Sequence, residues 1–496
     1  MDNLSKYFEV VDQSKQEFID KLREIVAIPS VSGDATRRQD VIRMGLWLKE
    51  KWEALGAETK RVDPGMQELQ GQTIPLPPII LGQYGNNPSK KTLLVYGHYD
   101  VQPALKEDGW NTDPFELVHN DKDQLVGRGA TDDKGPVLGW LCCAEAFKRA
   151  GIDFPVNLKF CFEGMEECGS EGLEEVVRHE ADKWFSGTDA VCISDNYWLG
   201  KNRPCLTYGL RGVSYFYITV EGPSADLHSG VFGGTVHEPM VDLVHLMSRL
   251  VDVKGKILIP SIYEKVAPLT LAEEKAYDGL DFNHDDLAKD LRSNVIIHDS
   301  EKDTLMHRWR LPSLSLHGIE GAFYGPGEKT VIPAKVTGKF SIRTVPDMDP
   351  AEVDRLACKY VADEFAKLNS KNKLTVKMVH DGRWWYSSPE HPNFVAGAKA
   401  IERVFGTSPD LTREGGSIPI TLTFEEALNR NVLLLPMGAS DDGAHSVNEK
   451  LDVRNFIEGI KVFGVYLEEL SKPRVPLTNS GDQQQQQQQQ QQMVAE

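Results

Sequence analysis

The stretch Thr92-Leu93-Leu94-Val95-Tyr96-Gly97-His98-Tyr99-Asp100 decides the fold class. Its first five residues favour a buried β-strand, and Gly97 ends the apolar run. Similar runs predict strands at 156–162, 189–194 and 432–435, and helix-forming segments lie at 137–149 and 171–179. Because strands alternate with helices, we expect an α/β protein with a mostly parallel sheet flanked by helices.

The pattern changes near Gly209. Residues 214–220 and 335–343 alternate between polar and apolar types, as half-exposed antiparallel strands do, and helical patterns lie at 241–250 and 351–368. We therefore predict an inserted α+β domain over 209–385, with 1–208 and 386–475 forming the first domain. Residues 476–496 contain an unbroken glutamine run at 483–492, which predicts a disordered tail because it has no apolar face to bury.

Charge and composition exclude several classes of protein. The 55 Lys and Arg residues against 74 Asp and Glu residues give a net charge of −19, which disfavours binding to nucleic acid or to an anionic membrane. The N-terminal segment mixes acids and bases unlike a signal peptide, and no apolar run approaches the ~18 residues of a membrane span. The seven cysteines are irregularly placed and indicate buried thiols in a reducing compartment. We expect a soluble cytoplasmic protein.

Acids and histidines follow the predicted strands, where ligands collect in an open parallel sheet. These positions are His98 with Asp100, the acids of the loop 127–135, Glu166-Glu167, Asp195, and His445 in the small-residue loop 438–445. The loop lacks the spacing of a phosphate-binding loop, so nucleotide binding is rejected. Taken singly, each position is more often a surface ion pair or a solvated acidic turn.

Together these positions predict a site for two divalent ions. Two histidines and three carboxylates suit Zn²⁺ or Mn²⁺, and a loop carboxylate can give one oxygen to each ion. His98 would bind metal while Asp100 accepts the other imidazole N–H. Consecutive acids face different directions, so one of Glu166 and Glu167 can ligate metal while the other acts as a base. The sequence pattern does not choose between the two ions, or between Asp132 and Asp133.

Several motifs resemble, in order, those of the carnosinase branch of the carnosinase–aminoacylase–desuccinylase metallopeptidase family. They are YGHYDVQPA, GRGATDDKGP, EGMEECGSEG, CISDNYWLG, YGLRG, DLHSGVFGG and LTREGGSIP, and the resemblance covers roughly residues 5–470. It implies a two-metal exopeptidase fold, in which the inserted domain is a lid and dimerisation module.

The resemblance also implies a role for individual residues. His98 and Asp195 would hold one ion, Glu167 and His445 the other, and Asp132 would lie between them. Glu166 would be the general base, supported by Asp100, and His228 would reach the site of a partner subunit to stabilise the oxyanion. Residues expected to contact substrate are Glu166, Asp195, His228, Thr330, Arg343, Glu414, Gly416, Ser417 and His445. Arg343, with Thr330 and Ser417, would receive the C-terminal carboxylate, and Glu414 the free amino end.

The implied activity is hydrolysis of dipeptides, such as Cys-Gly and carnosine-like substrates, by a homodimer. Three alternatives remain. The segment 168–172 comes close to a serine-hydrolase elbow but has Cys168 in place of the first glycine. A scaffold that binds partners through its glutamine tail would be expected to have lost ligands, yet every position is filled. An aminoacylase or carboxypeptidase of the same family would differ in substrate.

Overall fold

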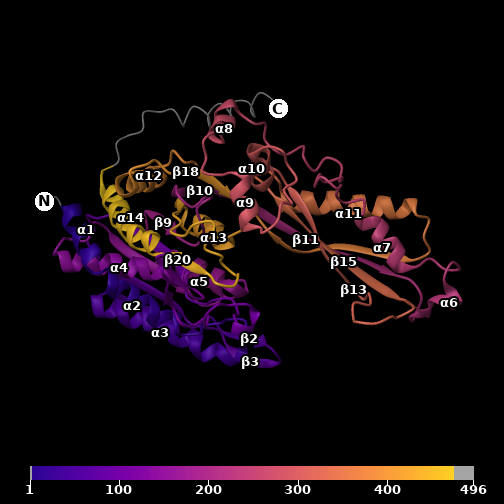
Figure 1. The fold of residues 1–496 in the computed structure, drawn as a ribbon, viewed down its shortest axis with the longest axis horizontal. Helices are drawn as coiled ribbons and strands as arrows, with labels where there is room; N and C mark the ends of the chain where they lie inside the picture. The colour runs from indigo at the N-terminus through magenta and orange to yellow at the C-terminus, as the bar shows by residue number, and fades with distance from the viewer. Residues whose placement is uncertain (1–2, 474–496) are drawn as a thin grey trace.

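The computed structural model describes residues 3–473, so the predicted glutamine-rich tail lies outside the described residues. Figure 1 shows two lobes joined end to end, one built around a large sheet and the other around a smaller one. Each sheet has its own hydrophobic core. The strong strand patterns of the sequence therefore belong to two separately packed units.

The large sheet contains the four strands that the apolar runs predict. They form a parallel array in the order β8 (Asn157–Glu163), β5 (Thr92–His98), β9 (Ala190–Ile193) and β19 (Val432–Leu434). The flanking strands are β1 (Glu58–Val62), β4 (Ile79–Tyr84), β10 (Cys205–Leu210), β17 (Trp385–Tyr386) and β18 (Asp410–Glu414). The mostly parallel α/β prediction is confirmed.

Helices cover both faces of this sheet. Residues adjacent on a strand point to opposite faces. The Tyr96 ring meets Phe424 of α13 (Pro419–Leu428), whereas a Cβ on Gly97 would lie 2.5 Å from Val137 of α4 (Lys134–Ala150). The α4 layer comprises α1 (Asn3–Gln13), α2 (Lys15–Val26), α3 (Arg38–Leu55), α4 (Lys134–Ala150), α12 (Pro392–Phe405) and α14 (Val453–Ser471). The α13 layer comprises α5 (Leu173–Glu180) and α13 (Pro419–Leu428).

The smaller sheet is antiparallel, as the alternating runs predict. Its order is β13 (Ser313–Glu320), β15 (Lys335–Thr344), β11 (Gly212–Glu221) and β16 (Lys373–Gly382). Buried and half-buried residues alternate along β11 because one face packs under α7 (Pro239–Met247) and α11 (Pro350–Lys367). The short helix α6 (Ser229–Phe232) lies at the far tip of this lobe (Figure 1).

Other short elements connect or extend these layers. They are β2 (Met66–Leu69), β3 (Gln72–Pro75), β6 (Val118–His119), β7 (Gln124–Val126), β12 (Leu227–His228), β14 (Val331–Ile332), β20 (Lys450–Asp452), α8 (Leu271–Ala276), α9 (His284–Asp290) and α10 (Glu301–Trp309). Within 3–473, no helix is both long enough and apolar enough to cross a membrane. All seven cysteines fall in the described residues and are free thiols. Five are buried as expected, whereas Cys168 is exposed and Cys358 is half-buried, so the expectation of buried thiols is wrong for these two.

Candidate metal centre

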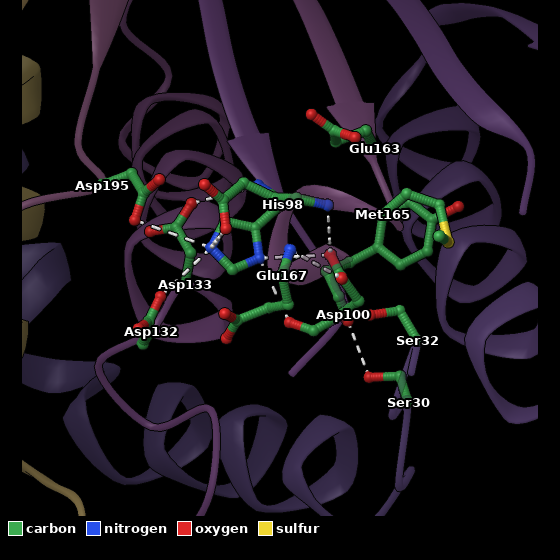
Figure 2. Close-up of polar contacts among 12 residues, drawn as sticks. Ser30, Ser32, His98, Asp100, Asp132, Asp133, Glu163, Met165, Glu167 and Asp195 are labelled. Atoms are coloured by element: carbon green, nitrogen blue, oxygen red, sulfur yellow. Dashed lines mark hydrogen bonds and ion pairs between the residues drawn. The ribbon is translucent and has the colours of Figure 1, made fainter. Parts of the chain in front are cut away.

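The predicted ligands lie together beyond the carboxyl ends of the parallel strands (Figure 2). His98 ends β5, Glu166 and Glu167 occupy a 3-10 turn directly after β8, and Asp195 follows β9. The segments after β9 and β19 also pair through Tyr197 and Gly438. This pairing holds the loop of His445 beside that of Asp195, so residues far apart in the chain meet at one sheet edge.

A first group of possible ligands surrounds the Nε2 atom of His98. Oδ1 of Asp132 lies 3.1 Å from it, Oδ1 of Asp195 3.6 Å and Oε2 of Glu166 4.0 Å. The His98 side chain is fully buried. Its other ring nitrogen, Nδ1, is 3.2 Å from the backbone oxygen of Asp100 and 3.3 Å from Oδ1 of the same residue. Asp100 therefore orients the imidazole with Nε2 facing the carboxylates.

A second group surrounds the Nε2 atom of His445. Oε2 of Glu167 is 2.9 Å away and Oδ2 of Asp132 is 3.1 Å away. Gln102 donates a hydrogen bond of 2.8 Å to the same Glu167 oxygen, which holds that carboxylate in place. The His445 side chain is 56 % exposed, so this group is the one that faces solvent.

Asp132 belongs to both groups because its two carboxylate oxygens face different histidines. A carboxylate with this geometry can give one oxygen to each of two cations. The neighbouring Asp133 points elsewhere, since its Oδ2 accepts the backbone N–H of His98 at 3.2 Å. A cis peptide joins the two aspartates, a feature that the sequence pattern did not suggest. The geometry thus separates two residues that spacing alone left equivalent.

The electrostatics of the site call for positive charge. Burial would lower the pKa of His98, but Asp195, Asp100 and Asp132 outweigh it and raise that pKa well above its usual value. Hydrogen bonds with Asp132 and Glu167 raise the pKa of His445 to about 10. Burial raises the pKa of Asp195 to about 6. Carboxylates outnumber the cations that could neutralise them, and two divalent ions would relieve that imbalance. The donor set of imidazole and carboxylate fits such ions.

Glu166 differs from its neighbour Glu167. Its side chain is 24 % exposed whereas that of Glu167 is 3 % exposed, and it is the carboxylate farthest from His98 Nε2 in the first group. Burial raises its pKa well above the usual range, with further increases from Asp195, Asp100 and Glu167. Oxygens of Asp100 accept the backbone N–H groups of Glu166 and Glu167, at 3.2 and 3.1 Å. Asp100 thereby fixes the turn that presents both acids.

The site opens into a cavity of about 470 Å³. Asp132, Glu166, Asp195 and His445 line one end of it. The lining also includes Glu414 at the end of β18, Gly416 and Ser417 just after it, and Arg308 and Trp309 of α10. Arg343 of β15 donates a hydrogen bond of 3.1 Å to Ser417 Oγ. The cavity therefore lies between the two lobes and has room for a small polar ligand.

His228 and Thr330 are not brought to this cavity. The two residues lie together on the small lobe, where the backbone N–H of Ser229 donates to the carbonyl of Thr330 at 3.2 Å. Both side chains are exposed and neither lines the cavity.

Sequence reasoning missed the residues that hold the Asp132 loop. Glu449 is fully buried and pairs with Arg128 at 2.7 Å. Its Oε1 accepts the backbone N–H groups of Thr131 and Asp132 at 3.0 and 3.1 Å. No periodic pattern surrounds Glu449, so only tertiary placement reveals its partners.

A further acidic group, Asp441, Asp442 and Asp452, encloses the ammonium of Lys450. The Lys450 Nζ atom lies 2.8, 2.7 and 2.9 Å from these three carboxylates, respectively. Asp442 also accepts the hydroxyl of Thr131 at 2.7 Å. A lysine already supplies the cation here, so this group supports the loops of the centre.

Comparison with known proteins gives a consistent result. Residues 94–469 match the model of Peptidase family M20/M25/M40. The chain is 59 % identical over 469 residues to a Cys-Gly metallodipeptidase of Schizosaccharomyces pombe, covering 95 % of this chain and 98 % of the relative. It is 46 % identical over 472 residues to the Beta-Ala-His dipeptidase of Homo sapiens, covering 95 % and 93 % respectively.

Solved structures agree with these sequence relatives. The di-peptidase Dug1p of Saccharomyces cerevisiae superposes with a TM-score of 0.86 at 52 % identity, covering 96 % of this chain and 100 % of that one. Human carnosine dipeptidase 1 gives a TM-score of 0.85 at 46 % identity, covering 94 % and 98 %. With its two histidine–carboxylate groups at the edge of a parallel sheet, the chain belongs to the M20/M25/M40 family of metallopeptidases.

Proposed function

We propose that this metallopeptidase hydrolyses dipeptides with a free C-terminal carboxylate, with Cys-Gly and carnosine-like dipeptides among its substrates. The observation that carries the proposal is the pair of ligand groups that share Asp132 and open into a small polar cavity. Relatives with the names Cys-Gly metallodipeptidase and Beta-Ala-His dipeptidase support the substrate class.

Two divalent ions, Mn²⁺ or Zn²⁺, complete the centre in this proposal. His98 and Asp195 would hold one, Glu167 and His445 would hold the other, and Asp132 would contribute to both. When bound, such a pair polarises the scissile carbonyl and makes water a better nucleophile at neutral pH. The distances of Asp132 to both histidines support this assignment.

Glu166 acts as the general base and then as the general acid. Its carboxylate takes a proton from the attacking water, a C–O bond forms, and the same proton passes to the leaving nitrogen as the C–N bond breaks. Its position at the cavity wall, with greater exposure than Glu167, supports a role in proton transfer. Asp100 contacts both the backbone of this turn and the His98 ring, so it fixes the position of Glu166 relative to His98.

Recognition of both charged ends restricts cleavage to dipeptides. Arg343 and Ser417 receive the C-terminal carboxylate, beside Gly416, and Glu414 faces the free amino group. The hydrogen bond between Arg343 and Ser417 supports a shared role. In a longer peptide, one charged terminus lies out of reach of its binding residue, and the charge-assisted hydrogen bonds of that terminus are lost.

The small lobe, residues 209–385, serves as a lid and dimerisation module between the catalytic segments 1–208 and 386–475. In this proposal His228 and Thr330 reach the cavity of a second copy, where His228 stabilises the oxyanion. Exposed apolar side chains near His228 support burial against a partner: Val231, Phe232, Val236, Val241 and Val244. The free thiols support a cytoplasmic location for the enzyme.

The test is hydrolysis by metal-free protein reconstituted with Mn²⁺ or Zn²⁺. We expect cleavage of Cys-Gly and β-Ala-His, little cleavage of the tripeptide Ala-Gly-Gly or of N-acetyl-alanine, and about two bound ions per chain. Preference for N-acetyl-alanine would identify an aminoacylase instead. Activity that survives a chelator and is lost to a serine-directed reagent would refute the metal centre.

A further inference from the structure

Three guanidinium groups gather around residues 415–417, of which Gly416 and Ser417 line the cavity. They belong to Arg211, Arg308 and Arg343, which we call the arginine cluster. Arg211 donates to the carbonyl of Gly415 at 3.0 Å and to Ser313 Oγ at 2.9 Å, and Arg343 donates to Ser417. Arg308 lines the cavity. Over residues 3–473, none of the three forms an ion pair with a carboxylate.

The cluster converges on the turn after β18. A Cβ atom on Gly415 would lie 3.0 Å from Nη2 of Arg211, 3.1 Å from the carbonyl oxygen of Arg308 and 3.6 Å from its Cγ. Gly415 is therefore packed between two of the arginines, and Ser417 contacts the third. This close approach places all three side chains around one short stretch of backbone.

Charge around residues 415–417 is unbalanced. The acidic residue lining this part of the cavity is Glu414, whose Oε1 accepts the backbone N–H of Gly415 at 2.7 Å. Three guanidiniums and one carboxylate leave two positive charges without an anion. Burial, followed by the positive charges of Arg343 and Arg308, lowers the pKa of Arg211 to about 10 despite the opposing effect of Glu414. In a chain of net charge −19, this is a local site for anions.

Contacts of neighbouring residues fix the backbone of Arg308 at the end of α10. Its neighbour Trp309 is 4 % exposed and packs beside Tyr277. Glu273 forms ion pairs with Arg310 at 3.1 Å and with Arg413 of β18 at 2.7 Å. These contacts tie the end of α10 to β18, so the Arg308 backbone is fixed while its exposed side chain stays available.

We propose that Arg308 is a specificity-determining residue that binds a carboxylate on the side chain of the substrate's second residue. The inference rests on the proposed function, in which Arg343 and Ser417 take the α-carboxylate. That carboxylate neutralises one guanidinium of the cluster, and a side-chain carboxylate neutralises another. Dipeptides that end in Asp or Glu are therefore better substrates than those that end in Asn or Gln. Guanidinium and carboxylate form strong paired hydrogen bonds.

The experiment compares Ala-Glu with Ala-Gln, which differ in charge and hardly in size. Metal-loaded wild type and Arg308→Gln are assayed for kcat/KM on both, with Arg249→Gln as a control that removes an exposed arginine outside the cavity. We expect the Ala-Glu to Ala-Gln ratio to fall about tenfold in Arg308→Gln, as loss of one charge-assisted hydrogen bond predicts. Arg249→Gln should keep the wild-type ratio. Arg308→Glu should shift preference toward Ala-Lys.

Each outcome decides between the two proposals. A wild type that cleaves Ala-Gln and Cys-Gly, combined with an unchanged ratio in Arg308→Gln, overturns the role of Arg308 and leaves the dipeptidase intact. An equal loss on both dipeptides also overturns it, because the residue would then be needed for packing. A wild type that cleaves no dipeptide overturns both proposals.

Discussion

The backbone N–H of Asp132 donates a hydrogen bond to Oε1 of Glu449, with 3.1 Å between nitrogen and oxygen, although 317 positions separate the two residues. The same carboxylate is paired with Arg128, and both side chains are almost completely buried. Asp132 is the residue whose two oxygens face both histidines of the centre. A buried ion pair between residues far apart in the chain therefore sets the position of the carboxylate that the two ligand groups share.

Substitution of Arg128 by Met should damage both the fold and the metal site. It leaves Glu449 as a buried charge without its partner, which costs about 3–5 kcal/mol of unfolding free energy. Movement of the Asp132 loop should weaken metal affinity by about 10–100-fold. Thermal unfolding of metal-free protein and metal titration measure the two effects. The double variant with Glu449→Gln should recover part of the lost stability, and a double variant less stable than Arg128→Met would contradict this account.

Glu166→Gln should separate chemistry from metal binding. The amide cannot transfer the proton, so kcat should fall by about 10²–10⁴-fold while bound metal stays near the wild-type amount. Glu167→Gln is the matched control, since its carboxylate lies 2.9 Å from His445 and its loss should lower metal content. Activity assays and elemental analysis of both variants check the prediction. Loss of metal from Glu166→Gln alone would reverse the two roles.

Mixing two inactive variants should restore activity if His228 acts in a partner's site. His228→Ala keeps its own metal centre, and Glu166→Gln keeps its own His228. A mixed dimer then contains one complete site, and random exchange should give about a quarter of wild-type turnover. The assay follows Cys-Gly hydrolysis after subunit exchange. Each variant alone is the control, and a mixture no more active than its components would place the role of His228 within one chain.

Stability should fall with rising pH because of Glu163. Burial raises the pKa of this carboxyl from 4.5 to about 7, although Tyr96 and Ser170 donate hydrogen bonds to it. The folded state therefore favours the protonated form, and the cost of ionisation grows between about pH 4.5 and 7 to about 3 kcal/mol.

The check is urea unfolding of chelator-treated protein at pH 5 and pH 8. Glu163→Gln keeps an oxygen acceptor and should gain stability relative to wild type at pH 8 but hardly at pH 5. Glu175→Gln, at an exposed position of α5, is the control and should show no such difference. Equal effects at both pH values would mean that Glu163 is ionised throughout.

Local pattern predicts the framework of the site well. The apolar runs that become β5, β8, β9 and β19 are bounded by glycine or by acids, so the side chains just after them were expected at one sheet edge. His98, Glu167 and Asp195 lie there. The antiparallel strand β11 also followed from simple alternation of residue types.

Long-range contacts set the rest, and these leave no periodic trace. Glu449 lies in irregular chain, so its hydrogen bonds to the Asp132 loop depend on how distant segments meet. The parallel pairing of β10 with β18, which carries Glu414 to the cavity, joins strands about two hundred positions apart. Arg308 lines the same cavity, and Glu273 links the end of α10 to that strand through Arg310 and Arg413.

The distance along the chain between His98 and His445 has a consequence for biosynthesis. His98 emerges from the ribosome long before His445 is added to the chain. A nascent or truncated chain that ends before His445 therefore has only part of the centre. Peptide-bond cleavage can begin only when the last strand of the parallel array, β19, and the loop beyond it have joined the sheet. The order of synthesis thus makes hydrolysis a property of the chain only after its last parallel strand has been made.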